Sequence, residues 1–204
     1  MFKMLLNKFV KNNNTKSSNT GAVQNKVSTS GVTEKITPPK LNMFEFNVAG
    51  VTAKNENKQD IQKLLKQQGK IYAKENQIDF YGGYKNKEII EDNIEISEFE
   101  DLVFYKDELS FIPEPTNEYD SNAIKIFIKY SELPVHIGYV PNDKNVELKN
   151  ILDNEDVRRI EARYVGGKIK SVEYDSDEDK DIIVTEEITL GIEIKVFYKP
   201  AKED

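Results

Sequence analysis

The sequence predicts a mainly β fold, a small barrel decorated by two short helices. Short runs in which apolar and polar residues alternate recur along the chain, and this period of two is typical of strands with one buried face. Only two segments carry apolar residues at the spacing of a helix face. Many short strands with few helices are typical of β-barrels. At 204 residues the chain is long enough for one good core with extensions.

The composition excludes several classes of site. There is no Cys, which rules out disulfides, thiolate metal sites and a cysteine nucleophile. The single histidine, His136, rules out a multi-histidine metal site, and we expect it in a partly exposed strand. No apolar run approaches the roughly 20 residues needed to span a bilayer. We therefore expect a cytoplasmic protein with no membrane span, no cofactor and no enzymatic activity.

Charge divides the chain into three parts. Residues 1–43 carry seven Lys and one Glu, a net charge of +6, while residues 44–172 carry −6 and residues 173–204 carry −7. Residues 11–43 have too few large apolar side chains to offset the entropy of ordering, so we predict a disordered basic tail and linker over 1–43. We expect one domain over 44–172. Residues 173–204 then form an acidic loop and a C-terminal strand that packs on the barrel.

The domain begins with a strand and a helix. Apolar residues alternate with polar ones over 44–48, which predicts a strand with one buried face that ends at Gly50. Asn57 or Asp60 then caps a helix with an apolar face, and Gly69 is its predicted stop.

Three segments connect this helix to the middle of the chain. Residues 71–84 read as two short strands, with a turn over 81–87. Residues 88–101 are acidic with alternating Ile. Residues 102–112 are apolar at both ends and polar between, a hairpin-like pattern.

Residues 111–140 hold a strand end, a polar turn and two strands. Pro113 and Pro115 lack the backbone donors that a helix or a central sheet strand would need, so the chain must turn here. Residues 123–128 are apolar at nearly every position, which predicts a strand buried largely on both faces.

The remaining elements are a helix and a series of strands. Asn142 or Asp143 caps the second helix, which ends near Asn154. Gly166-Gly167 is a two-residue hairpin signal between two strands. The strands predicted in this region are 157–165, 168–174, 182–184 and 188–198.

Polar side chains gather in the turn before the strand 123–128. Asn117, Asp120 and Asn122 can each hydrogen-bond nearby backbone groups, so the turn has its own scaffolding. From the residues alone two interpretations stay open: these side chains only brace a β-connection, or a polar loop on a rigid strand presents a binding site. A cation held by Glu114, Asn117 and Asp120 is disfavoured, because hard ligands are few.

A second acidic cluster resembles a calcium-binding loop only in part. Asp175, Asp177, Asp179 and Glu186 fall at ligand positions of that template. However, Lys180 stands where the template needs Gly, and strands flank the segment. We predict a solvated acidic loop without a metal.

Two sequence blocks resemble a known family. PEPTNEYDSNAIKI over 113–126, followed by IGYVP over 137–141, resembles the HIRAN domain. FNVAGV over 46–51 and YVGG over 164–167 fall where that family has its first strand and its late hairpin. The resemblance covers roughly 44–172 and implies a small OB-like barrel.

The resemblance also implies a site for the 3′-hydroxyl end of single-stranded DNA and a role in DNA repair. Carried over to this sequence, Tyr119 stacks on the terminal base, Asp120 accepts the 3′-hydroxyl hydrogen, and Asn117 hydrogen-bonds the end nucleotide. Tyr139 and Asn142, on the second block, make further contacts. Asn47 lies on the first strand, where the family has an aromatic and a basic residue; this sequence has no basic residue there.

We therefore expect a non-enzymatic module that binds single-stranded DNA at its 3′ ends, with the basic tail adding weak phosphate attraction. The alternative is a protein-interaction adaptor that has lost DNA binding, since an acidic domain gives phosphates an unfavourable field. Salt dependence separates the two, because phosphate contacts weaken steeply with salt and an apolar protein interface does not.

Overall fold

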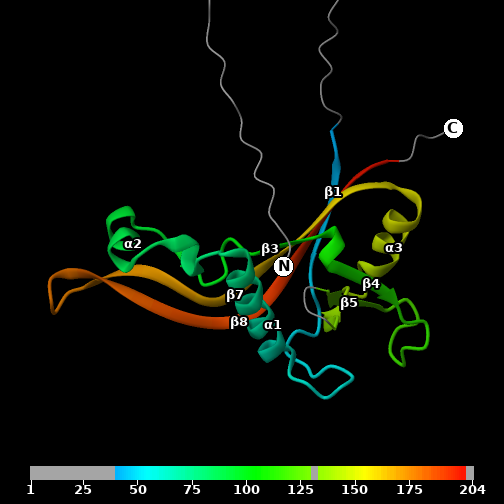
Figure 1. Cartoon of the computed structure of the whole chain (residues 1–204), viewed down its shortest axis with the longest axis horizontal. Helices are drawn as coiled ribbons and strands as arrows, with labels where there is room; N and C mark the ends of the chain where they lie inside the picture. The colour runs from blue at the N-terminus through cyan, green and yellow to red at the C-terminus, as the bar shows by residue number, and fades with distance from the viewer. Residues whose placement is uncertain (1–39, 130–132, 201–204) are drawn as a thin grey trace, which may run out of the picture. The chain divides into compact units, whose positions relative to one another are not determined.

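A computed structural model describes residues 40–129 and 133–200 of the chain. Its described part contains eight strands in two antiparallel sheets and three α-helices, which confirms the mainly β prediction (Figure 1). The predicted tail lies outside the described residues, apart from 40–43. No closed barrel is detected in the described part, so the OB-like barrel stays a prediction.

The larger sheet is built around two long strands. These are β7 (Asp156–Asp175) and β8 (Lys180–Lys199), which pair with each other as a hairpin. The first strand, β1 (Asn42–Asn47), pairs with β8, and β2 (Ile96–Ser97) and β3 (Val103–Tyr105) pair with β7. The predicted first strand is therefore confirmed.

The smaller sheet has the order β4-β5-β6. Its strands are β4 (Leu109–Pro113), β5 (Ile124–Ile128) and β6 (Val135–Tyr139). The strand predicted over 123–128 is thus confirmed, but its burial alternates along the strand and is not complete on both faces as predicted. The hairpin predicted over 102–112 is wrong. Strands β3 and β4 are joined by the 3-10 helix η2 (Lys106–Glu108) and pair with different partners, β7 and β5.

Helix α1 (Ile61–Asn76) starts where the sequence predicts and runs past its predicted end. The Asp60 side chain caps it by accepting the backbone N–H of Lys63 at 3.1 Å. Gly69 does not stop the helix: a Cβ there would lie 3.1 Å from the Phe99 ring, so this glycine serves close packing. The two strands predicted over 71–84 are therefore wrong, because α1 and the 3-10 helix η1 (Phe80–Gly83) occupy that region.

The other two α-helices differ in part from the prediction. Helix α2 (Asn86–Asp92) was not predicted, so the described part has three α-helices where the sequence predicts two. Helix α3 (Asn145–Asn154) matches the predicted second helix. Its N-cap position is Lys144, which makes no side-chain capping bond, so neither Asn142 nor Asp143 caps it.

The β7–β8 hairpin also corrects the predicted turn. Gly166 and Gly167 lie inside β7 with φ of +74° and +78°, at a register irregularity, and β7 continues beyond them to Asp175. The reversal comes after Asp175, whose Oδ1 accepts the backbone N–H of Asp177 at 2.9 Å. A pair of glycines with positive φ fits a hairpin turn and a bulge equally well, and here it forms a bulge.

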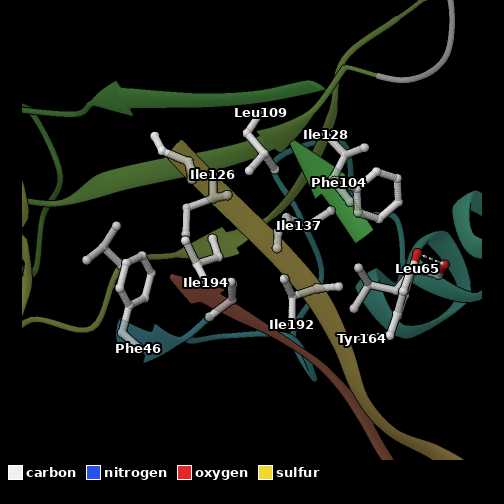
Figure 2. Packing of buried hydrophobic residues seen from close by; sticks show 14 of the residues in the cluster. Phe46, Leu65, Phe104, Leu109, Ile126, Ile128, Ile137, Tyr164, Ile192 and Ile194 are labelled. Atoms are coloured by element: carbon white, nitrogen blue, oxygen red, sulfur yellow. Dashed lines mark hydrogen bonds between the residues drawn. The ribbon is translucent and has the colours of Figure 1, made fainter. Parts of the chain in front are cut away.

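The core lies where the two sheets and α1 meet (Figure 2). Ile126 and Ile137 of the smaller sheet face Ile192 and Ile194 of β8, and all four are fully buried. Tyr164 of β7 enters the same core and donates its hydroxyl hydrogen to the Leu65 carbonyl oxygen at 2.8 Å (Figure 2). Complete burial raises the pKa of Tyr164 far above its usual value.

Candidate functional site

Five of the six predicted site residues line one surface pocket of about 480 Å³. The pocket lies between the loop from β4 to β5, the end of β6 and the segment that leads into α3. The sixth residue, Asn47, is exposed at the end of β1 and does not line it. The lining consists of Ala49, Asn117, Tyr119, Asp120, Ala123, Tyr139, Val140, Pro141 and Asn142.

The β4–β5 loop is held by its own side chains. The Asn117 Oδ1 atom accepts the backbone N–H of Tyr119 at 3.0 Å and that of Asp120 at 3.2 Å. The Asp120 Oδ1 atom accepts the backbone N–H of Asn122 at 2.8 Å. Bonds of this kind fix a tight polar turn. The side chains of Asn117 and Asp120 thus brace the turn as predicted, whereas Asn122 takes part through its backbone N–H.

Gly138 allows the segment that follows β1 to approach the end of β6. Its φ is +137°, and a Cβ would lie 2.3 Å from the Ala49 carbonyl oxygen. Without that Cβ, Ala49 and Tyr139 exchange two backbone hydrogen bonds, of 2.8 and 2.9 Å. The glycine of the IGYVP block is therefore needed for a close backbone approach, which places Ala49 beside Tyr139 in the pocket lining.

A carboxylate next to the pocket organises three neighbouring donors. Glu114 accepts hydrogen bonds from the Lys125 ammonium at 2.8 Å, from the Asn117 amide at 2.7 Å and from the Tyr139 hydroxyl at 3.2 Å. These donors, Lys125 first, lower the pKa of Glu114. Lys125 also contacts Glu56 at 2.6 Å, and the bonds to Glu114 and Glu56 together raise its pKa.

The Tyr139 hydroxyl stays protonated at neutral pH. Partial burial raises its pKa above the usual value, and the negative charge of Glu114 raises it further. The neutral Tyr139 hydroxyl thus donates a hydrogen bond to Glu114, and Tyr139 also lines the pocket. This network links the side chains of both sequence blocks.

Asp120 is held from two sides. Its Oδ1 atom takes the Asn122 N–H, and its Oδ2 atom takes a hydrogen bond of 2.5 Å from the amide of Asn145. Asn145, at the start of α3, is only 2% exposed and was not among the predicted site residues. A signal for it exists in the sequence: Asn145, Leu148 and Ile151 are spaced three apart and share the buried face of α3.

Tyr119 is far more exposed than its neighbour Asp120. Its side chain is 95% exposed. An exposed aromatic ring at the rim of a pocket offers a stacking surface to any planar group that enters.

The pocket lining contains no Lys or Arg side chain. Its polar groups are a carboxylate, two amides and two phenols, and the ionised Glu114 hydrogen-bonds Asn117 and Tyr139 of the lining. Such a site can stack a planar ring and hydrogen-bond neutral donors and acceptors. It repels a second negative charge.

The other candidates from the sequence do not join this pocket. His136 is 4% exposed, so the expectation of a partly exposed strand residue is wrong; its ring packs against Phe127 and Tyr139. Burial lowers its pKa. Among the described residues, no group of acidic or histidine side chains that could hold a metal ion is found, and no described helix has the length and apolarity to cross a membrane.

Comparison with known families adds one finding. Residues 93–179 match the family model described as the HIRAN domain. The matched segment contains the β4–β5 loop, the IGYVP block and α3, and it confirms the predicted resemblance. No curated protein and no solved structure matches the chain.

Proposed function

Because residues 93–179 belong to the HIRAN family, whose domains are in general DNA-binding modules without catalytic activity of their own, we propose that this protein binds the 3′-hydroxyl end of single-stranded DNA. The observation that carries the proposal is the convergence of Asn117, Tyr119, Asp120, Tyr139 and Asn142, from two separated sequence blocks, on one pocket. The pocket holds the terminal nucleoside.

Each group in the pocket has a part in this binding. Tyr119 stacks on the terminal base, an interaction worth roughly 1–3 kcal/mol that tolerates any base. Asp120 accepts the hydrogen of the 3′-hydroxyl with a carboxylate that is already oriented by two donors. Asn117 and Asn142 offer amides to the edge of the nucleotide.

The charge of the pocket gives selectivity for an unphosphorylated end. A 3′-phosphate would bring about two negative charges against the Asp120 carboxylate, with Glu114 behind it. No Lys or Arg lines the pocket to offset the charge of Asp120, whereas the charge of Glu114 is partly offset by Lys125, which contacts it at 2.8 Å. The internucleotide phosphates of the bound strand lie outside the pocket.

Fluorescence anisotropy with short single strands tests the proposal. The full chain is titrated against matched strands that end in a 3′-hydroxyl or in a 3′-phosphate and share a blocked 5′ end. We expect the hydroxyl end to bind at least about tenfold more tightly, a difference of about 1.4 kcal/mol. Equal affinity for the two strands would contradict end recognition.

A second function, a protein-interaction adaptor, is favoured by one observation, the net charge of −6 over residues 44–172. In that case a peptide would occupy the pocket. Binding to DNA would then be weak, and the affinity for the partner would change little with salt.

A further inference from the structure

We propose that Asn145 is a positioning residue that fixes the Asp120 carboxylate in the orientation that receives the 3′-hydroxyl. The inference rests on the proposed function, because Asp120 is the acceptor in that proposal. Asn145 itself does not line the pocket. It acts through Asp120, 25 residues earlier in the chain.

The position of Asn145 is unusual for an amide. It is the first residue of α3, where polar side chains ordinarily face water or cap the helix. Here the side chain is buried, and the N-cap position, Lys144, makes no side-chain capping bond. The Asn145 amide donates to the Asp120 carboxylate of the β4–β5 loop.

An asparagine at position 145 is a poor choice if its role is only to stabilise the fold. The Oδ1 atom of Asn145 is buried and has no hydrogen-bond partner within the described part of the chain. A buried acceptor without a partner costs free energy, so an apolar side chain beside Leu148 would suit packing better. What the amide contributes is one directed bond to a charged group.

That bond completes the restraint on Asp120. The Asn122 N–H holds Oδ1 from within the loop, and the Asn145 amide holds Oδ2 from α3. One donor on each oxygen fixes the rotation of the carboxylate as well as its direction. A pre-oriented acceptor pays little ordering cost when its ligand arrives.

The experiment compares Asn145→Leu with a matched control, Gln68→Leu. Gln68 is also a buried amide with an unpartnered oxygen in the described part, but it lies in α1 and does not line the pocket. We measure binding of the full chain to 3′-hydroxyl and 3′-phosphate single strands. We also measure thermal midpoints and, by NMR couplings without DNA, the χ1 rotamer of Asp120.

For Asn145→Leu we expect about tenfold weaker binding to the 3′-hydroxyl strand, a thermal midpoint equal to or above that of the natural chain, and an Asp120 χ1 averaged over rotamers. Gln68→Leu should leave binding and the Asp120 χ1 unchanged. If Asn145→Leu does not fold, Asn145→Ala is measured in the same way, because it removes the same hydrogen-bond donor and introduces a smaller side chain.

Two results would overturn the inference. One is unchanged binding and an unchanged single Asp120 rotamer in folded Asn145→Leu. The other is a lower thermal midpoint with a single Asp120 rotamer, which would make Asn145 merely structural. A natural chain that fails to prefer 3′-hydroxyl ends would remove the proposed function, while the χ1 comparison would still decide whether Asn145 orients Asp120.

Discussion

Asp120 and Tyr119 are neighbours in the chain with opposite surroundings. The Asp120 carboxylate is half-buried and held by two donors, whereas the Tyr119 ring is 95% exposed. A group whose geometry is fixed can discriminate between ligands, and an exposed ring can stack on many. The two side chains should therefore affect binding in different ways.

Asp120→Ala should weaken binding to a 3′-hydroxyl strand, because the acceptor of the hydroxyl hydrogen is lost. It should also reduce the ratio of the affinity for the 3′-hydroxyl strand to that for the 3′-phosphate strand, because the charge that repels the phosphate is lost with it. Tyr119→Ala should weaken binding to both strands alike, by about 10-fold or more, because stacking does not sense the sugar's end group. Anisotropy titrations measure both. Tyr105→Ala, an exposed tyrosine outside the pocket, is the control and should bind normally. Small, equal effects of the two pocket variants would contradict the assignment.

Glu114 makes stability depend on pH in a defined direction. Its pKa in the folded protein lies below the usual value of about 4.5, since Lys125, Asn117 and Tyr139 donate to the carboxylate. The stabilisation is therefore complete above about pH 4.5 and is lost as the pH falls through the lowered pKa. Urea unfolding of Glu114→Gln and the natural chain should show a stability difference at about pH 7 that shrinks towards about pH 3. A difference that is constant with pH would contradict this.

At the scale of the elements, β5 connects the pocket to the core. Its burial alternates, with Ile124, Ile126 and Ile128 inside and Lys125 directed to Glu114 and Glu56. One strand thus buries apolar side chains on one face and organises the pocket's polar network on the other.

Ile126→Ala should lower the free energy of unfolding by about 2–5 kcal/mol, because it removes a fully buried side chain and leaves a cavity. Ile112→Ala, in the neighbouring β4, is the control: that side chain is 46% exposed and should cost well under about 1 kcal/mol. Urea unfolding measures both. Similar values for the two would contradict the described packing of the smaller sheet.

The elements also show why sequence reasoning succeeded only in part. Strands β1 and β5 have a clear apolar pattern and were predicted. The glycines were misread, because Gly69 and the pair Gly166-Gly167 are explained by partners distant in sequence: the ring of Phe99 at Gly69 and the Thr189 carbonyl oxygen at Gly166. Helix α2 buries a single side chain, Ile89, and so carries almost no periodic signal.

The candidate site was more predictable than the fold around it. Its residues lie in two contiguous blocks, so local motifs were sufficient to name the five residues that share the pocket. Asn47 lies outside this pocket, because the chain meets β6 only after β1 has ended, at the antiparallel bridge between Ala49 and Tyr139, and that pairing is a tertiary property. Asn145 was missed because its bond to Asp120 spans 25 residues.

At the scale of the whole molecule, charge is distributed unevenly. The basic excess lies in residues 1–43, while the domain with the pocket is acidic. End recognition and phosphate attraction are therefore assigned to different parts of the chain in the proposed function.

Deleting residues 1–39 should leave the thermal midpoint unchanged within a few degrees, because residues 11–39, which make up most of this segment, have too few large apolar side chains to add to a core. It should also make the affinity for single strands slightly weaker and less dependent on salt, as Lys residues that attract phosphates are lost. Calorimetry and anisotropy at several salt concentrations measure these effects. A large fall in the midpoint would show that the segment packs on the domain.

The pairing of β1 with β8 has a consequence for chain connectivity. Asn42 lies opposite Tyr198 in this antiparallel ladder, so the first and last strands of the described part run side by side. Folds whose ends are adjacent generally tolerate circular permutation. A short linker that joins residue 199 to residue 42 and new termini in an exposed connection, such as the one between η1 and α2, would preserve every strand pair. The permuted chain should therefore still form the pocket, because none of the residues that line it lies at the new linker or at the new termini.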